Sequence, residues 1–550
     1  MTLMTGGQAL VQSLKIEGID TIFGLPGIQL DFAFDALWEE REAIKVWHTR
    51  HEQACAYMAD GYARTTGRIG TFLVVPGPGL LNASAGLSTA YACSSPVLAI
   101  SGQIQSDLIG VGRGVLHEIN HQLETISGVC KHVERAMTPE AIPAMVHRAI
   151  RELETGRPRP VEIEVPPDVL ERVADVTLLE PETFARAEAD PDLLERAAEL
   201  LGKAERPLIV SGGGVLSSHA WEELRELAAV LEAAVYMSSN GRGAVSDRDY
   251  HAVVGQAALG ELLSQADVVL AVGTRFVLPP RLSESRPAGQ SFIQLDIDPE
   301  EVGRNREPAL GIVGDAKHGL GELARRTGRH NRHRASRETE LAALKRGVAE
   351  QMGKLELQAS LAHAIRDVLP DDGIFVSEST QVGYWSQGGG FPVYEPRTFL
   401  TSGYQGTLGY GFATALGAQA GNPDRKVVSI NGDGGFFYNV QELSTMAKHQ
   451  IPLVAVVFND GAYGNVRRIQ EVRFNGHTMS SDLQNPDMLK LSEAFGVAAT
   501  RAKTADELRR ALDGALASNA PHLIEVPMPP TIEMPSTFPM EPLPPRPVLG

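Results

Sequence analysis

Residues 427–464 read VVSINGDGGFFYNVQELSTMAKHQIPLVAVVFNDGAYG, and this stretch decides the fold. Val427–Ile430 is a short apolar run rich in β-formers, so it predicts a buried strand. Gly434–Gly435 opens a predicted helix, in which Val440, Leu443, Met446 and Ala447 recur at helical spacing. Leu453–Phe458 predicts a second buried strand. Together these segments predict a βαβ unit with parallel strands and a right-handed crossover.

Two carboxylates follow the two predicted strands. Asp433 comes just after the first strand and Asp460 just after the second, at the sheet edge where open α/β folds bind ligands. Mg²⁺ binds few protein oxygens and completes its shell with phosphate oxygens. The amides of Gly434 and Gly435, at the expected helix N-terminus, favour an anion. The unit therefore predicts a metal-bridged diphosphate site, and the alternative is a solvated turn with two ordinary surface aspartates.

A family resemblance sharpens this prediction. Gly432-Asp433-Gly434, followed by Asn459-Asp460-Gly461, resembles the GDG…NN motif of thiamine-diphosphate enzymes. The resemblance implies that Mg²⁺ is held by Asp433, Asp460 and the Ala462 carbonyl, and it places Gly434, Gly435, Tyr463 and Gly464 beside the cofactor. The chain departs from the motif at Asp460, where the family has Asn. Asp still offers an oxygen ligand but adds a negative charge beside the diphosphate.

Glu52 is the candidate for proton transfer. It stands at a predicted strand-to-helix junction, before a helix rich in small residues that permit close packing. Burial there would raise the pKa of its carboxyl group and suit it to proton exchange near neutral pH. The alternative is a first-turn glutamate that interacts only with the helix dipole. The segment from His51 to Arg64 looks like the RHEQ…GYAR segment of acetolactate synthases, which implies that Glu52 hydrogen-bonds N1′ of the cofactor's aminopyrimidine.

Further segments agree with the same family. Gly24–Gly27 resembles its first active-site loop, with Pro26 and Gly27 near the cofactor, and Pro76–Gly79 with Asn82 resembles its GPGxxN loop. Val382-Gly383-Tyr384 corresponds to a turn beside the diphosphate. In Gly403–Gly409 the Gly406 carbonyl would accept from the 4′-amino group, and Leu408 would force the cofactor into a V shape. The alternative for Leu408 is an ordinary core leucine.

The substrate side departs from acetolactate synthases. Leu116-His117-Glu118 stands where they have Phe-Gln-Glu, so His117 is a candidate acid/base or orienting donor, although a structural histidine on a loop is the alternative. Gln29 and Lys131 are weaker pocket candidates. The family's flavin loop is short here, so the resemblance gives little support for FAD. The middle region could hold FAD, another nucleotide or nothing.

Composition narrows the class of protein. The net charge of −18 argues against nucleic acid or an anionic membrane as partner. No run of 18 apolar residues predicts a transmembrane helix, and the N-terminus lacks the order of a secretory signal. The three cysteines have no metal or redox spacing, which favours a reducing cytoplasm.

The sequence predicts an α/β protein with three doubly wound parallel-sheet domains. By resemblance these are a pyrimidine-binding domain at 1–175, a Rossmann-like middle domain at 190–325 and a diphosphate-binding domain at 355–530. An extended Pro-rich tail is expected at 531–550. Because the family builds each site from two subunits, a homodimer is the expected minimum and a homotetramer is plausible.

The expected function is decarboxylation of a 2-oxo acid with carboligation, dependent on thiamine diphosphate and Mg²⁺, as in acetolactate synthases. Alternatives are simple 2-oxo acid decarboxylation, as in benzoylformate decarboxylase, and carbon–carbon cleavage of a 2-hydroxy ketone or 2-hydroxyacyl-CoA. A non-catalytic family member is a further alternative, against which the presence of Glu52 argues.

Overall fold

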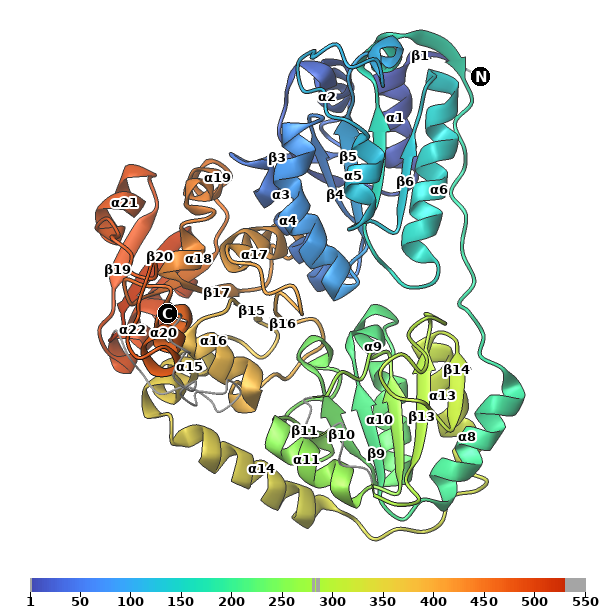
Figure 1. Ribbon diagram of the computed structural model, residues 1–550, viewed down its shortest axis with the longest axis vertical. Coiled ribbons are helices and arrows are strands. Elements are labelled where there is room, and N and C mark those ends of the chain that lie inside the picture. The colour runs from blue at the N-terminus through green and yellow to red at the C-terminus, as the bar shows by residue number, and fades with distance from the viewer. Residues whose placement is uncertain (1, 279–281, 283–286, 530–550) are drawn as a thin grey trace, which may run out of the picture.

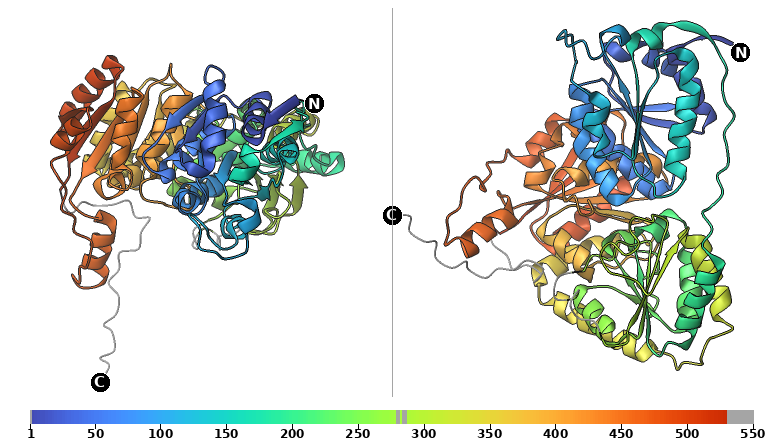
Figure 2. Two further views of the ribbon diagram at one scale, coloured as in Figure 1. Left: turned by 90° about the horizontal axis from the view of Figure 1, so that it is seen from above. Right: turned by 45° about the vertical axis from the view of Figure 1, so that its right-hand side comes forward.

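The computed structural model describes residues 2–278, 282 and 287–529, and it contains three six-stranded parallel sheets. Figures 1 and 2 show one lobe for each sheet, in the order of the chain from blue through green to red. A short antiparallel pair joins β1 (Thr2–Thr5) to β8 (Val173–Val176). The predicted fold class of three parallel-sheet α/β units is confirmed. Within the described residues, no helix combines the length and apolarity needed to cross a membrane.

The first sheet has the strand order β3-β2-β4-β5-β7-β6. Its strands are β2 (Thr21–Gly24), β3 (Lys45–His48), β4 (Gly70–Val74), β5 (Val97–Gly102), β6 (His132–Arg135) and β7 (Val161–Val165). The apolar faces of α1 (Gly6–Ile16), α2 (Asp31–Glu39) and α6 (Ile142–Glu154) pack in one core of this sheet. α3 (Glu52–Thr66) and α4 (Pro78–Cys93) pack in another, which continues into the third lobe.

The middle sheet has the order β11-β10-β9-β12-β13-β14. Its strands are β9 (Pro207–Ser211), β10 (Ala234–Met237), β11 (Ala252–Val253), β12 (Val268–Val272), β13 (Ser291–Asp296) and β14 (Leu310–Val313), with α8 (Pro191–Lys203), α10 (Trp221–Leu231), α11 (Gln256–Gln265) and α13 (Ala316–Thr327) around them. The segment between β8 and α8 forms no helix or strand and runs between the first and middle lobes at the right of Figure 1.

The third sheet has the order β16-β15-β17-β18-β20-β19. Its strands are β15 (Ile374–Ser377), β16 (Phe399–Leu400), β17 (Val427–Gly432), β18 (Val454–Asn459), β19 (Ala498–Arg501) and β20 (His522–Pro527). The helix α14 (Glu338–Gly353) precedes the third lobe in the chain. The lobe also contains the helices α15 (Glu356–Val368), α17 (Tyr410–Gly421) and α22 (Ala505–Ser518). The predicted Pro-rich tail at 531–550 lies outside the described residues.

The helix expected between β17 and β18 is broken, which corrects the prediction. The chain forms α18 (Asp433–Phe436), the 3₁₀ turn η6 (Val440–Glu442) and α19 (Leu443–Lys448). The break occurs where Asn439 turns its side chain to donate from Nδ2 to the Gly409 carbonyl at 2.7 Å. A four-residue α18 has little macrodipole, so the expected help of a long helix to anion binding does not apply.

α3 and α17 bring the first and third lobes into direct contact. A Cβ added at Gly61 of α3 would lie 2.0 Å from the Thr414 carbonyl oxygen, and one at Gly417 of α17 would lie 1.9 Å from the Met58 carbonyl oxygen. The small residues predicted to allow close packing of the helix after Glu52 therefore do so. This contact sets where Glu52, the first residue of α3, stands relative to the third sheet.

Candidate functional site

Glu52 and Asn82 form the centre of the first group of site residues. Asn82 on α4 donates from Nδ2 to Glu52 Oε2 at 3.0 Å. His51 caps α3, since its Nδ1 accepts from the Gln53 N–H at 3.2 Å. Glu52 is half-buried in the single chain rather than enclosed in a dry interface. Through Asn82, α4 thus orients the carboxylate that begins the neighbouring helix α3.

The Pro76–Gly79 loop lies beside this carboxylate. A Cβ at Gly79 would be 3.6 Å from Glu52 Oε1, and a Cβ at Gly27 would be 2.3 Å from Val75, the residue before the loop. The predicted segments at Pro26–Gly27, Glu52, Pro76 and Asn82 are therefore gathered at the carboxyl ends of β2 and β4. The structure thus brings these sequence motifs together at one edge of the first sheet.

His117 and Gln29 form a pair next to the same loop. His117 Nδ1 lies 3.1 Å from Gln29 Oε1, and Gln29 Nε2 donates to the Leu116 carbonyl at 3.2 Å. His117 has a φ of 68°, and its carbonyl oxygen would lie 2.3 Å from a Cβ at Gly77. The two predicted residues thus hold each other beside the loop. Lys131 instead donates to the carbonyls of Glu152 and Thr155 and is not among these groups.

Gln122 is a residue whose role sequence reasoning missed. Its Oε1 accepts from the Gly77 N–H at 2.8 Å, and its Nε2 donates to Glu164 Oε2 at 2.6 Å. Glu164 is fully buried on β7 and is paired with Arg135. The loop near Glu52 is therefore anchored to a buried acidic residue of the sheet. A glutamate inside the apolar run of β7 was the available signal.

Asp433 and Asp460 form the centre of the second group, at the carboxyl ends of β17 and β18. Burial is the largest cause that raises the pKa of the Asp460 carboxyl group, and the negative charge of Asp433 is the second. Asn485 donates to Asp433 Oδ2 at 2.5 Å and to Asn459 Oδ1 at 2.9 Å. Two neighbouring carboxylates repel each other unless a proton or a cation lies between them, so this donor set fits a divalent cation. Asn485 is a second residue that the sequence did not reveal.

The metal would need ligands beyond these side chains. In the part of the chain that the structure describes, no group of three or more His, Cys, Asp or Glu could hold a metal ion. Two carboxylates with backbone and phosphate oxygens are the usual set for Mg²⁺. The Ala462 N–H donates to Asp460 Oδ1 at 3.2 Å. Ala462, whose carbonyl is a predicted metal ligand, therefore lies in the same loop as Asp460.

The remaining residues predicted around the diphosphate lie close to these carboxylates. A Cβ at Gly464 would be 2.2 Å from Asp460 Oδ2, and a Cβ at Gly434 would be 2.7 Å from the Tyr463 ring. Val382, Gly383 and Tyr384 belong to α16 (Gln381–Trp385), which starts just past β15. Thr380 caps this helix by accepting from the Gly383 N–H at 2.8 Å. The sheet edge thus collects three of the predicted segments.

Gly406 and Leu408 lie on a loop between α17 and the first lobe. Gly406 is exposed and Leu408 half-buried, while Thr407 Oγ1 lies 2.7 Å from Thr89 Oγ1 of α4. A fully enclosed core leucine, the alternative for Leu408, does not match this exposure. Next in the chain, the Gly409 N–H donates to Glu378 Oε1 at 2.7 Å. Glu378 is a third site residue that the sequence analysis passed over, although its place directly after a strand was a signal.

The two groups are not joined within one chain. Among residues 2–278, 282 and 287–529, no hydrogen bond or ion pair links Glu52 or Asn82 to Asp433 or Asp460. Exposed apolar side chains accompany both groups: Leu81 and Leu116 beside the first, Tyr438 and Val466 beside the second. Such apolar exposure is typical of surfaces that another chain covers.

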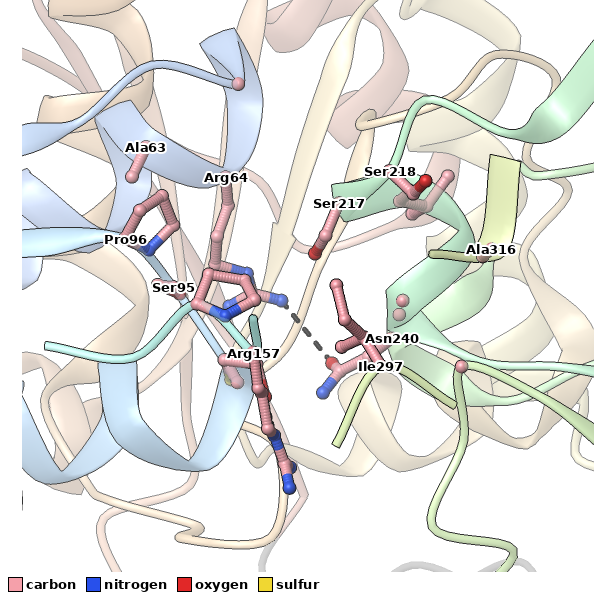
Figure 3. A pocket seen from close by; sticks show the side chains of 18 of the residues that line it. Ala63, Arg64, Ser95, Pro96, Arg157, Ser217, Ser218, Asn240, Ile297 and Ala316 are labelled. Carbon is pink, nitrogen blue, oxygen red and sulfur yellow. Dashed lines mark hydrogen bonds between the residues drawn. The ribbon is translucent and has the colours of Figure 1, made fainter. Parts of the chain in front are cut away.

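A large cavity lies elsewhere, between the first and middle lobes (Figure 3). Its volume is about 880 Å³, and Arg64 spans it to donate to Asn240 Oδ1 at 3.4 Å. Its walls include Arg157 on one side and Ser217, Ser218 and Ala316 on the other. The cavity lies at the carboxyl ends of middle-sheet strands. This is the region for which the sequence allows FAD, another nucleotide or no ligand.

Comparisons with known proteins match all three parts of the chain. Residues 4–125, 194–323 and 379–526 match the models for the N-terminal TPP binding domain, the central domain and the C-terminal TPP binding domain of thiamine pyrophosphate enzymes. A probable acetolactate synthase large subunit of Methanocaldococcus jannaschii is 32% identical, with 98% of this chain and 94% of that protein covered. Acetolactate synthase isozyme 2 large subunit of Escherichia coli is 32% identical, with 95% of each covered. A probable 2-ketoarginine decarboxylase of Pseudomonas aeruginosa is 33% identical, with 95% of this chain and 94% of that protein covered.

Proposed function

The chain belongs to the thiamine pyrophosphate enzyme family, of the acetolactate synthase type, and on that premise we propose that it decarboxylates a 2-oxo acid and joins the remaining fragment to a second carbonyl compound. The observation that carries the proposal is the Asn82–Glu52 hydrogen bond beside the Pro76–Gly79 loop. Together they present an oriented carboxylate at a sheet edge, which is what proton transfer to a bound ring requires.

Thiamine diphosphate fits the two groups of residues. Pro26, Gly27, Pro76 and Asn82 would surround the aminopyrimidine, with Gly406 and Leu408 on its other side. Val382–Tyr384, Gly434, Gly435, Tyr463 and Gly464 would surround the diphosphate. When bound, this cofactor supplies a carbon nucleophile that adds to the keto carbon and lets carbon dioxide leave.

Glu52 is proposed to hold a proton at N1′ of the aminopyrimidine, with Asn82 keeping Oε2 in place. Asp433, Asp460 and the Ala462 carbonyl are proposed to hold Mg²⁺ against the diphosphate. His117, oriented by Gln29, is proposed to face the substrate and to donate or accept a proton there.

The complete site is proposed to form between two chains, with Glu52 of one and Asp433 of the other. The exposed apolar side chains beside each group support this. A homodimer is then the smallest active unit, and a homotetramer would hold two such dimers. We also propose a cytoplasmic location, which the three unpaired cysteines suit.

The decisive experiment is incubation of the purified protein with pyruvate, thiamine diphosphate and Mg²⁺. Carboligation gives acetolactate, whereas simple decarboxylation gives acetaldehyde. Acetolactate as the main product is the expected result. Acetaldehyde alone would replace carboligation with simple decarboxylation.

A second candidate is decarboxylation of a larger 2-oxo acid without carboligation. The 33% identity to a probable 2-ketoarginine decarboxylase, as high as that to the acetolactate synthases, favours it, and so does His117 in place of the synthases' Gln. Carbon dioxide release from 2-ketoarginine but not from pyruvate would select this candidate over the first.

Cofactor retention tests the proposed ligands separately from the reaction. Asp433→Ala removes a carboxylate from the metal site, so thiamine diphosphate should be lost on gel filtration in Mg²⁺, and retention as in the wild type would contradict the ligand assignment. Flavin is not part of the proposal. If the purified protein showed the visible absorption typical of oxidised flavin, FAD would have to be included among its cofactors.

A further inference from the structure

Glu378 is a buried carboxyl group directly after β15, and its two oxygens differ in their surroundings. The side chain is 1% exposed, and Oε1 accepts from the Gly409 N–H at 2.7 Å. Oε2 is buried with no hydrogen-bond partner among the residues described. A buried charged oxygen without a partner is costly. In an ionised Glu378, Oε2 would therefore be a buried charged oxygen without a hydrogen bond from the described residues.

A second buried oxygen without a partner lies beside it. β15 and β17 pair Ser377 with Ile430, so Glu378 and Asn431 occupy the next adjacent positions of the two strands. A Cβ at Gly411 of α17 would lie 3.0 Å from Glu378 Oε2 and 2.5 Å from Asn431 Oδ1. Asn431 Oδ1, like Glu378 Oε2, has no hydrogen-bond partner within the described part of the chain. Both acceptors therefore face the same spot on α17.

The orientation of the Asn431 amide is fixed by its other contacts. Its Nδ2 donates to the Val456 carbonyl and to Ser429 Oγ, each at 3.1 Å. Turning the amide over would point its oxygen at the Val456 carbonyl, and two acceptors repel. Rotation of the amide thus cannot supply the missing donor.

We propose that Glu378 is a neutral carboxylic acid whose Oε2–H donates to Asn431 Oδ1, and that in this state it is a positioning residue for the cofactor. One proton then satisfies both buried acceptors and ties the ends of β15 and β17 together. The inference rests on the proposed function, because the backbone that Glu378 supports is the backbone proposed to hold thiamine diphosphate.

Glu378 supports that backbone on two sides. Gly409, which it bonds, directly follows Leu408, and the Gly409 carbonyl is held by Asn439 Nδ2 at 2.7 Å. A Cβ at Gly435 would lie only 2.0 Å from Glu378 Oε1, so the carboxyl group also packs against the chain that follows Asp433. A change at this one group would therefore shift both the loop around the pyrimidine and the turn around the diphosphate.

Its proton is exchangeable in the physiological range. Burial raises the pKa of Glu378 to about 7, against the opposing effect of the Gly409 and Gly411 N–H groups. Two titratable groups lie near enough to feel the charge of Glu378, Tyr57 of α3 and Tyr384 of α16. Burial is the main cause that raises the pKa of each phenol, and the charge of Glu378 raises it further. Both phenols stay neutral. When Glu378 loses its proton, its negative charge is therefore uncompensated and lies next to Gly435. An anionic diphosphate then binds less tightly.

The test compares the wild type with Glu378→Gln. Glutamine keeps an oxygen for the Gly409 N–H and offers an N–H to Asn431 Oδ1, so it imitates the neutral acid at every pH. The dissociation constant of thiamine diphosphate is measured by calorimetry in saturating Mg²⁺ at pH 6 and pH 8. Dividing the wild-type value by the variant value removes the pH dependence that both proteins share, including the titration of Asp460. The ratio should be about 1 at pH 6 and about 10 at pH 8 if only the protonated state binds.

A ratio that is the same at both pH values would overturn the inference, while tight binding by the wild type would leave the proposed function standing. Failure of the wild type to bind the cofactor at either pH would reject both. Glu162→Gln is the matched control, because Glu162 is a buried carboxyl group with a raised pKa in the first sheet. Its cofactor affinity should follow the wild-type pH dependence.

A second measurement needs no cofactor. The infrared difference spectrum of the wild type minus Glu378→Gln at pH 6 should contain the carbonyl band of a buried protonated carboxylic acid, and this band should disappear by pH 8.5. Absence of the band at pH 6 would overturn the assignment of the proton even if cofactor affinity behaved as expected.

Discussion

Asn82 and Glu52 show how a single hydrogen bond can orient the group that handles a proton. Glu52→Gln removes the ionisable group, so hydrogen exchange at the thiazolium C2 of bound cofactor should fall by about 10²- to 10⁴-fold. Asn82→Ala removes only the donor at 3.0 Å, and loss of a hydrogen bond of about 1.4 kcal/mol should slow exchange about tenfold. Deuterium exchange followed by NMR measures both.

Ser84→Ala is the control for this pair, because Ser84 lies on the same helix as Asn82 and its hydroxyl group, among the described residues, bonds the Leu81 carbonyl alone. Its exchange rate should match the wild type. Equal exchange in the wild type and in Glu52→Gln would remove Glu52 from the proton transfer.

The sequence reveals those site residues that lie in contiguous motifs. Glu52 and Asp433 stand beside glycines and strand ends whose spacing can be read along the chain. Glu378, Gln122 and Asn485 act on residues 31, 45 and 52 positions away. The local sequence does not show which residues these side chains bond, because the pairing exists only after the sheets have formed.

At the scale of elements, α3 and α17 pack through positions where a side chain has no room. Gly417→Ala would put a Cβ 1.9 Å from the Met58 carbonyl oxygen. Overpacking of this kind costs about 1–3 kcal/mol, and the backbone partner cannot rotate away. Chemical denaturation should therefore show a lower free energy of unfolding for Gly417→Ala.

The control for this substitution is Gly347→Ala in the middle of α14, where a Cβ would meet nothing within 4 Å. Alanine is the better helix former, so this variant should be about 0.5–1 kcal/mol more stable than the wild type. If both variants lost the same stability, close packing of α3 against α17 would not be the cause.

Glu442 of η6 connects the third lobe to the chain just before α3. Both of its oxygens accept from the Arg50 N–H at 3.1 Å, and burial raises the pKa of this carboxyl group to about 6. A raised native pKa means that the folded protein holds the proton more tightly than the unfolded chain. The associated stability is complete below the unfolded pKa of about 4.5 and is lost as the pH rises through 6.

Glu442→Gln has no such titration. As the pH rises from 4.5 to 7, the free energy of unfolding of the wild type should therefore fall by about 2 kcal/mol relative to that of Glu442→Gln. Urea unfolding at several pH values measures the gap between the two proteins. A gap that does not change with pH would show that Glu442 has an ordinary pKa in the native state.

The two strands of the βαβ unit, β17 and β18, follow from the sequence more closely than the helix between them. Leu453–Phe458 is predicted as a strand, and β18 is observed at Val454–Asn459, because a short apolar run enclosed on both faces has few alternatives. The segment after Asp433 has helical spacing, yet it is interrupted where Asn439 reaches back to Gly409. A tertiary hydrogen bond overrides the local pattern there, and periodicity alone cannot register it.

For the whole molecule, the proposed sharing of each site between two chains has a consequence that can be measured with two inactive variants. Glu52→Gln disables the first group of its chain and Asp433→Ala disables the second. If each site takes Glu52 from one chain and Asp433 from its partner, a mixed dimer has one site with both substitutions and one site with neither. A site built within one chain would carry one substitution in every copy.

Equal amounts of the two variants, unfolded together and refolded, should therefore recover about a quarter of wild-type activity, since about half of the dimers are mixed and each has one intact site. Each variant refolded alone should stay inactive, which excludes leakage from either substitution. Mass spectrometry of the intact assemblies measures the share of mixed dimers independently of activity. Mixed dimers without recovered activity would mean that Glu52 and Asp433 serve the same site within one chain, and the shared site proposed here would be wrong.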